Sequence, residues 1–141
     1  MNACQELAFS AAELGLACHL LSDQQGAGYI TQVLQKFTPN KLSGHLAIHH
    51  DSLSIPFEQY ELTFPQYLKS EPIYVFFEQS RENKENVFVL EEGQQFGKVM
   101  NNTYGYEYFV SNATMAYLLA VNWYVIEGAG SAIEWMKPLQ K

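Results

Sequence analysis

Positive charge is scarce in this chain of 141 residues, which has eight Lys and Arg residues against fifteen Asp and Glu. The formal net charge is −7, and the only arginine, Arg81, lies close to Glu82 and Glu85. Nucleic-acid binding depends on clustered Lys and Arg side chains that neutralise phosphates. The composition therefore argues against direct nucleic-acid binding. The negative net charge would instead favour a basic protein as a partner.

Cysteine is also scarce, since Cys4 and Cys18 are the only two. In one helix they would lie about 21 Å apart, too far for a disulfide within the chain. The first fifteen residues lack a basic start and carry Glu6 and Glu13, so we do not expect a signal peptide. No apolar run is long enough to suggest a membrane span. These features predict a cytoplasmic protein with reduced thiols and no membrane segment.

Apolar residues are abundant by contrast, at 48% of the chain, and aromatic residues make up 14%. Such a composition can bury a substantial core, and the length suits one domain over residues 1–141. Helical spacing of apolar residues occurs from Leu7 to Leu21, although Gly15 could end that helix and leave residues 16–21 as a strand. A second helical pattern, from Tyr29 to Phe37, follows the break Gly26-Ala27-Gly28.

Strand patterns dominate the rest of the chain. Ile73–Glu78 (IYVFFE) and Asn86–Glu91 (NVFVLE), joined by a polar bridge, predict an antiparallel hairpin. Gly44–His50 and Tyr104–Val110 alternate as further strands, and Ser111-Asn112 predicts the cap of a helix over residues 113–122. We therefore expect an α+β fold, in which N-terminal helices and one C-terminal helix pack on one face of an antiparallel β-sheet.

The segment YGYEYFV is the strongest candidate for a binding surface. On a strand, Tyr104, Tyr106 and Tyr108 share one face, and a stripe of three hydroxyls suits a core poorly. Tyrosine is enriched at protein interfaces, so the stripe favours a protein-binding patch. With Glu107 and with Glu78 from the neighbouring hairpin, such a patch would be both aromatic and acidic.

The segment GHLAIHHD is the candidate metal site, with His45, His49, His50 and Asp51 as ligands. On a strand, His45 and His49 lie about 13 Å apart and cannot share one ion. On a helix they are four residues apart, a spacing that chelates metals. The strand interpretation is favoured, and with it the expectation that the protein holds no cofactor.

Three further patterns have weaker functional interpretations. Cys18-His19 suggests a thiol nucleophile, but neighbouring residues on a helix do not face one another. The sequence IEGAGS, residues 126–131, is similar to a phosphate loop, but it lacks a lysine and is more often a turn. Glu127 and Glu134 flank this segment and could form an acid–base pair, although their spacing does not distinguish them from other carboxylates.

The order PIYVFFEQ, a polar bridge, ENVFVLEEG and then EYFVSN resembles the SMI1/KNR4-like domains over roughly residues 72–130. Several small bacterial domains of this type are cytosolic immunity proteins that bind toxins. The resemblance implies function by binding, and it transfers no catalytic residue. The chain lacks the Asn-Gly-Gly type of element that this family often has after the proline-rich segment.

The sequence thus supports three hypotheses of different classes. The first is a non-enzymatic protein-binding module, with an immunity-type protein as its narrower form, whose basic partner contacts Tyr104, Tyr106, Glu107, Tyr108 and Glu78. The second is a small-ligand or metal-binding domain, or a hydrolase, that uses His45, His49, His50 and Asp51. The third is a homodimeric structural protein in which the tyrosine face contacts its own copy.

Overall fold

The computed structural model describes residues 1–140 and confirms an α+β fold, with five α-helices and one seven-stranded antiparallel sheet in these residues. The helices are α1 (Ala3–Glu13), α2 (Asp23–Phe37), α3 (Phe57–Tyr60), α4 (Phe96–Asn101) and α5 (Ala132–Met136). The strands are β1 (Cys18–Leu20), β2 (Ser52–Pro56), β3 (Ile73–Phe76), β4 (Phe88–Leu90), β5 (Tyr108–Ser111), β6 (Tyr117–Val121) and β7 (Val125–Gly130). Their order across the sheet is β1-β4-β3-β5-β6-β7-β2.

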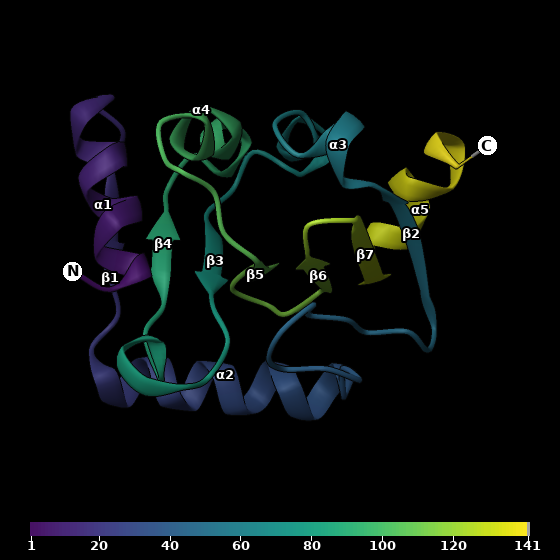
Figure 1. Cartoon of the computed structure of the whole chain (residues 1–141), viewed down its shortest axis with the longest axis horizontal. Helices are drawn as coiled ribbons and strands as arrows, with labels where there is room; N and C mark the ends of the chain where they lie inside the picture. The colour runs from purple at the N-terminus through teal and green to yellow at the C-terminus, as the bar shows by residue number, and fades with distance from the viewer. Residues whose placement is uncertain (141) are drawn as a thin grey trace.

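Both faces of the sheet are covered, not one as the sequence predicted. Helix α2 passes along one side of the strands, and α1, α4 and α3 lie on the other side (Figure 1). Ile30 and Val33 of α2 belong to the core on the first face, together with Leu46 and Ile48 of the irregular segment 41–51. Leu7 of α1 and residues of α4 and α5 belong to the core on the second face.

Burial on both sides explains why the predicted helix over residues 113–122 is wrong. Residues 117–121 form β6, and all five are buried. A strand that is covered on both faces needs apolar residues at every position, so its sequence does not alternate. A short continuous apolar run of this kind cannot be distinguished from a buried helix by periodicity.

Two of the other predicted elements are correct in position. Ile73–Glu78 and Asn86–Glu91 form the antiparallel pair β3–β4, in which Val75 lies opposite Phe88. At the N-terminus, the break at Gly15 is the correct alternative, because α1 ends at Glu13 and residues 18–20 form β1. Gly15 has a φ of 72°, in the left-handed region that glycine adopts without strain.

Two other predicted strands are not regular over their full length. Gly44–His50 is an irregular segment with positive φ at His45 and His49. In Tyr104–Val110 only the last three residues belong to a strand, β5. Residues 52–56, for which no strand was predicted, form the edge strand β2, which pairs with β7.

The predicted glycine break at residues 26–28 is also wrong, because these residues lie inside α2. The helix begins earlier, at a capping box in which Ser22 and Gln25 bond each other's backbone amides. Gly26 is required by packing, since a Cβ atom there would lie 2.0 Å from the carbonyl oxygen of Glu85. At Gly28 a Cβ atom would meet nothing within 4 Å.

These two glycines provide a matched pair of substitutions. We expect Gly26→Ala to lower the free energy of unfolding by about 1–3 kcal/mol, because the helix must move away from Glu85. Gly28→Ala should raise it by about 0.5–1 kcal/mol, since alanine is the better helix former and has room. Urea unfolding of both variants measures the difference, and equal effects at the two positions would contradict this packing of α2.

Candidate functional site

The three predicted tyrosines do not form one exposed stripe. Tyr108 lies in β5, is only 2% exposed, and packs edge-on against Phe77 and Phe96. Its prediction as a surface binding residue is wrong, because both faces of β5 are covered. Tyr104 is fully exposed, and Tyr106 is partly buried with its ring 5.3 Å from that of Phe77.

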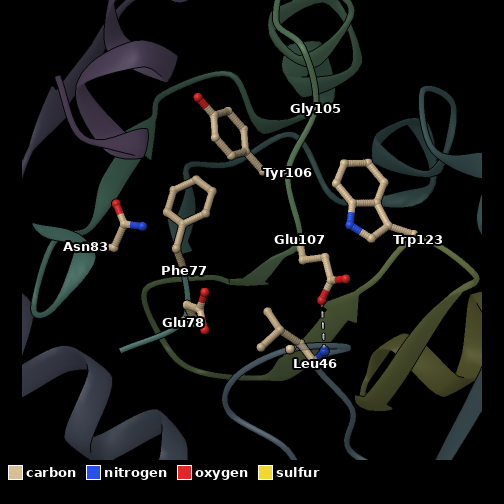
Figure 2. Close-up of a pocket in the computed structure, with 9 residues that line it drawn as sticks. Leu46, Phe77, Glu78, Asn83, Gly105, Tyr106, Glu107 and Trp123 are labelled. Carbon is tan, nitrogen blue, oxygen red and sulfur yellow. Dashed lines mark hydrogen bonds between the residues drawn. The ribbon is translucent and has the colours of Figure 1, made fainter. Parts of the chain in front are cut away.

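The structure brings together three of the five residues predicted for the binding patch. Glu78, Tyr106 and Glu107 line one cavity of about 280 Å³. The remaining lining residues are Gly44, Leu46, Phe77, Asn83, Gly105 and Trp123. Figure 2 shows Trp123 on one side and the rings of Phe77 and Tyr106 on the other, with both carboxylates below the rings. We call this the sheet-end cavity.

Strand pairing places these residues at one end of the sheet. In the antiparallel pair β3–β5, Phe76 lies opposite Phe109, so the end of β3 meets the segment that precedes β5. In the pair β5–β6, Tyr108 lies opposite Val121, so that same segment also meets the end of β6. Trp123 lies two residues after the end of β6. Three segments that are distant in sequence therefore converge on the cavity.

The cavity is acidic and contains no Lys or Arg among its lining residues. Glu107 is partly engaged: its Oε1 accepts a hydrogen bond from the Leu46 amide at 3.1 Å, and its Oε2 lies 3.6 Å from Nδ1 of His45. The half-buried Glu78 side chain has no hydrogen bond or ion pair within residues 1–140. Across these residues, the ion pairs are two His–Glu contacts, and no Lys or Arg pairs with a carboxylate.

Aromatic side chains form the exposed rim of the cavity. Trp123 and Tyr124 are the two tip residues of the β6–β7 hairpin and are 48% and 70% exposed. Two-residue hairpin loops usually contain Gly, Asn or Asp, so turn formation does not require this Trp-Tyr pair. Asn122 organises the turn instead, since its Oδ1 accepts from the amides of Tyr124 and Val125.

The sequence analysis did not identify this tip, because it assigned the preceding residues 113–122 to a helix that does not form. Gly105 lies against the Trp123 ring, where a Cβ atom would be 3.4 Å from two ring carbons, and its φ is 90°. Phe57 packs edge-on against the same ring, with the centroids 5.8 Å apart. The ring is thus held on two sides while half of its surface faces solvent.

The predicted metal ligands do not converge. Within residues 1–140, no three His, Cys, Asp or Glu side chains gather in an arrangement that could hold a metal ion. The three histidines contact different partners: Nδ1 of His45 lies 3.6 Å from Glu107, Nδ1 of His49 lies 3.3 Å from Asn40, and Nε2 of His50 lies 3.0 Å from Thr38. Asp51, with a φ of 47°, is an exposed turn residue between this segment and β2.

Side chains from the sheet hold the backbone of the histidine-bearing segment. The Ile48 amide donates to Oε1 of Glu127 at 2.7 Å, and Asn122 donates to the Leu46 carbonyl at 3.0 Å. Glu127 and Glu134 are therefore not an acid–base pair: Glu127 anchors this segment from β7, while Glu134 is exposed on α5.

We expect Glu127→Ala to lower the free energy of unfolding by about 1–3 kcal/mol, because the Ile48 amide loses a charged acceptor. Glu127→Gln keeps an acceptor oxygen and should cost less. Glu134→Ala removes the same charge from an exposed position and should stay within about 0.5 kcal/mol of the wild type. Urea unfolding measures all three, and equal losses at the two positions would show that the anchor is not needed.

The Cys18-His19 pair does not form a nucleophilic dyad. Nδ1 of His19 lies 3.2 Å from Oε1 of Glu91, while the Cys18 thiol lies 3.9 Å from the Ala8 carbonyl oxygen. Both cysteines are free. Burial raises the pKa of the Cys4 thiol from 9.0 to about 12, and a backbone hydrogen bond at Phe88 opposes this only in part. A thiol so protected is protonated and unreactive at neutral pH.

The raised pKa of Cys4 predicts a loss of stability in alkali. The thiol ionises near pH 9 in the unfolded chain but only near pH 12 in the folded one, so its stabilisation is full below pH 9 and declines above it. Relative to Cys4→Ala, the wild type should lose about 1.4 kcal/mol of unfolding free energy between pH 8 and about pH 10. Urea unfolding at both pH values tests this, with Cys18→Ala expected to retain the loss. A pH-independent difference between the wild type and Cys4→Ala would contradict it.

The glycines of IEGAGS do not form a phosphate loop. Residues 126–130 lie within β7, and the amide of Ser131 donates to the Ala116 carbonyl at 2.9 Å. Gly128 is needed because a Cβ atom there would lie 2.2 Å from the sulfur of Met136, so the glycine lets α5 pack closely on the sheet.

No protein-family model, curated protein or solved structure matches this chain. The resemblance to SMI1/KNR4-like domains therefore stays a prediction from the sequence. Among the helices of residues 1–140, none combines the length and apolar character that crossing a membrane requires.

Proposed function

We propose that this protein is a non-enzymatic binding module that recognises a basic protein partner through the sheet-end cavity. The observation that carries the proposal is the composition of the cavity. It combines Glu78 and Glu107 with the rings of Phe77, Tyr106 and Trp123, and it includes no cationic residue.

The size and chemistry of the cavity suit one inserted Lys or Arg side chain. A volume of about 280 Å³ lies at the lower limit for small-molecule sites, which span about 300–1,000 Å³. A cationic head would meet the unpaired Glu78 carboxylate and the second oxygen of Glu107, and the Trp123 face offers a cation–π contact. Burial and the neighbouring Glu6 carboxylate raise the pKa of Tyr106, whose hydroxyl is therefore occupied by Glu6 while its ring lines the cavity.

Exposed aromatic residues extend the proposed surface beyond the cavity. Trp123 lines the cavity, and Tyr104 and Tyr124 are exposed neighbours in sequence of the lining residues Gly105 and Trp123. Tyr and Trp are the residue types most enriched in binding hot spots. The negative charge of the whole chain would also accelerate encounter with a basic protein and would repel phosphate-bearing ligands.

A cytoplasmic location and an immunity-type role against a basic toxin are the finer form of this proposal. Two unpaired thiols suit a reducing compartment. The immunity-type role rests on the resemblance over residues 72–130 alone.

Selection of a random-peptide phage library on the immobilised protein tests the proposal directly. We expect enrichment of peptides that contain Arg or Lys beside an apolar residue. A selected peptide should bind the double variant Glu78→Gln/Glu107→Gln at least about tenfold more weakly, because two carboxylates lose their charge. Binding to the wild type should also weaken as NaCl is raised. Fluorescence anisotropy of the labelled peptide measures each affinity.

Glu92→Gln is the matched control, because it removes an exposed charge beyond the opposite end of β4 and should not change the affinity. Trp123→Ala should weaken binding without a large loss of stability. Peptides that lack basic residues, or a double variant that binds as well as Glu92→Gln, would contradict the proposal. Sedimentation of the dilute protein tests the homodimer hypothesis. If the wild type is a dimer and Trp123→Ala is a monomer, the surface around the sheet-end cavity binds a second copy of the chain.

A further inference from the structure

A second cavity, of about 470 Å³, lies at the opposite end of the sheet. It lies between the segment that leads into β3, the turn between β5 and β6, and the start of α5. Its lining residues are Tyr67, Leu68, Lys69, Glu71, Asn112, Ala116, Tyr117, Ser131, Glu134 and Trp135. This volume falls within the usual range for sites that hold a small molecule. None of these residues lines the sheet-end cavity.

A flat aromatic pair forms one side of this second cavity. The rings of Tyr67 and Trp135 are stacked, with their centroids 5.4 Å apart and their planes within 6° of parallel. Tyr67 comes from a 3₁₀ turn before β3 and Trp135 from α5, so two separate elements hold the pair in place. Such a surface favours a planar ligand, because stacking needs an extended flat contact.

An unpaired hydroxyl is buried among the lining residues. Tyr117 is 4% exposed, and its hydroxyl is the one buried side-chain oxygen or nitrogen in residues 1–140 without a hydrogen-bond partner. Burial raises the pKa of this phenol, and the nearby Glu71 carboxylate raises it further, so the hydroxyl keeps its proton. A buried donor without an acceptor is unfavourable for folding, and a ligand acceptor would recover the lost hydrogen bond.

Glu71 places an acceptor near this donor. Its Oε2 accepts a hydrogen bond from Nδ2 of Asn112 at 2.8 Å, and Asn112 is itself fixed because its Oδ1 accepts from the Ala116 amide at 2.9 Å. The Oε1 atom of Glu71 has no partner within residues 1–140. Beside the exposed polar residues of its lining, the cavity therefore offers a buried donor without a partner, on Tyr117, and a free acceptor atom, on Glu71.

We propose that this second cavity binds a neutral planar heterocycle of nucleobase size, whose ring edge carries a hydrogen-bond acceptor beside an N–H donor. The ligand ring stacks on the outer face of the Tyr67–Trp135 pair, its acceptor atom accepts from the Tyr117 hydroxyl, and its N–H donates to Glu71. Two carboxylates and one ammonium line the cavity, so a phosphorylated ligand is disfavoured. This proposal does not depend on the function proposed for the sheet-end cavity.

NMR titration of the ¹⁵N-labelled protein with inosine tests this proposal, because the base of inosine has such an edge. Up to about 10 mM inosine should give saturable shifts of the Trp135 indole and of the Ala116 and Ser131 amides. 1-Methylinosine, which lacks the N–H, should bind at least about fivefold more weakly, and inosine 5′-phosphate should also bind more weakly than inosine.

Tyr117→Phe separates a binding role from a structural one. The variant should bind inosine about 2- to 10-fold more weakly, while its melting temperature stays the same or rises, because an unsatisfied hydroxyl is removed. Glu71→Gln should weaken inosine binding as well, through loss of the charged acceptor. The proposal is overturned by a lack of saturable shifts, by equal binding of 1-methylinosine, by tighter binding of the phosphate, or by unchanged affinity in both variants.

Discussion

Two backbone amides of the irregular segment 41–51 donate to carboxylates that project from the sheet, at Leu46 to Glu107 and at Ile48 to Glu127. These bonds allow a segment without regular structure to cover the apolar face that α2 leaves open. Buried amides must find acceptors, and here no neighbouring strand supplies them. Carboxylate acceptors therefore replace the backbone hydrogen bonds that a neighbouring strand would supply. Leu46 and Ile48 complete the core on that face.

The same contacts define the sheet-end cavity. Glu107 is held by the Leu46 amide, so one of its oxygens has a fixed direction, while the other accepts no hydrogen bond within the described residues and lies 3.6 Å from Nδ1 of His45. Leu46 is itself a lining residue, so the anchor that completes the core also forms part of the cavity. The Glu78 side chain has no comparable hydrogen bond within the described residues. A half-buried carboxylate without a partner is unfavourable for folding alone, which is why its position supports a role in binding.

Local patterns predicted the elements whose sequences differ from their surroundings. The β3–β4 hairpin could be predicted because a polar bridge separates two aromatic runs, whereas β6 could not, since its uninterrupted apolar run also suits a helix. Gly26 was predicted to break a helix for a related reason. It is needed because α2 packs closely against the Glu85 backbone, a contact that sequence spacing does not show. Glu78, Tyr106 and Glu107 were predicted from residue type, but their convergence depends on the β3–β5 register. Trp123 was missed because its turn depends on Asn122, within a segment assigned to a helix.

The two cavities lie at opposite ends of the sheet because only there are side chains free of the core. Strands β5 and β6 are buried at every position, so changes within them act on packing, and of their residues only Tyr117, at the start of β6, also lines one of the two cavities. Beyond the strand ends, residue choice is set less by packing, and there the chain has carboxylates and aromatic rings that folding does not require. One end combines two carboxylates and no cation in a space for a single side chain. The other combines a stacked aromatic pair with an unpaired donor and acceptor in a larger space, so the two ends suit ligands of different classes.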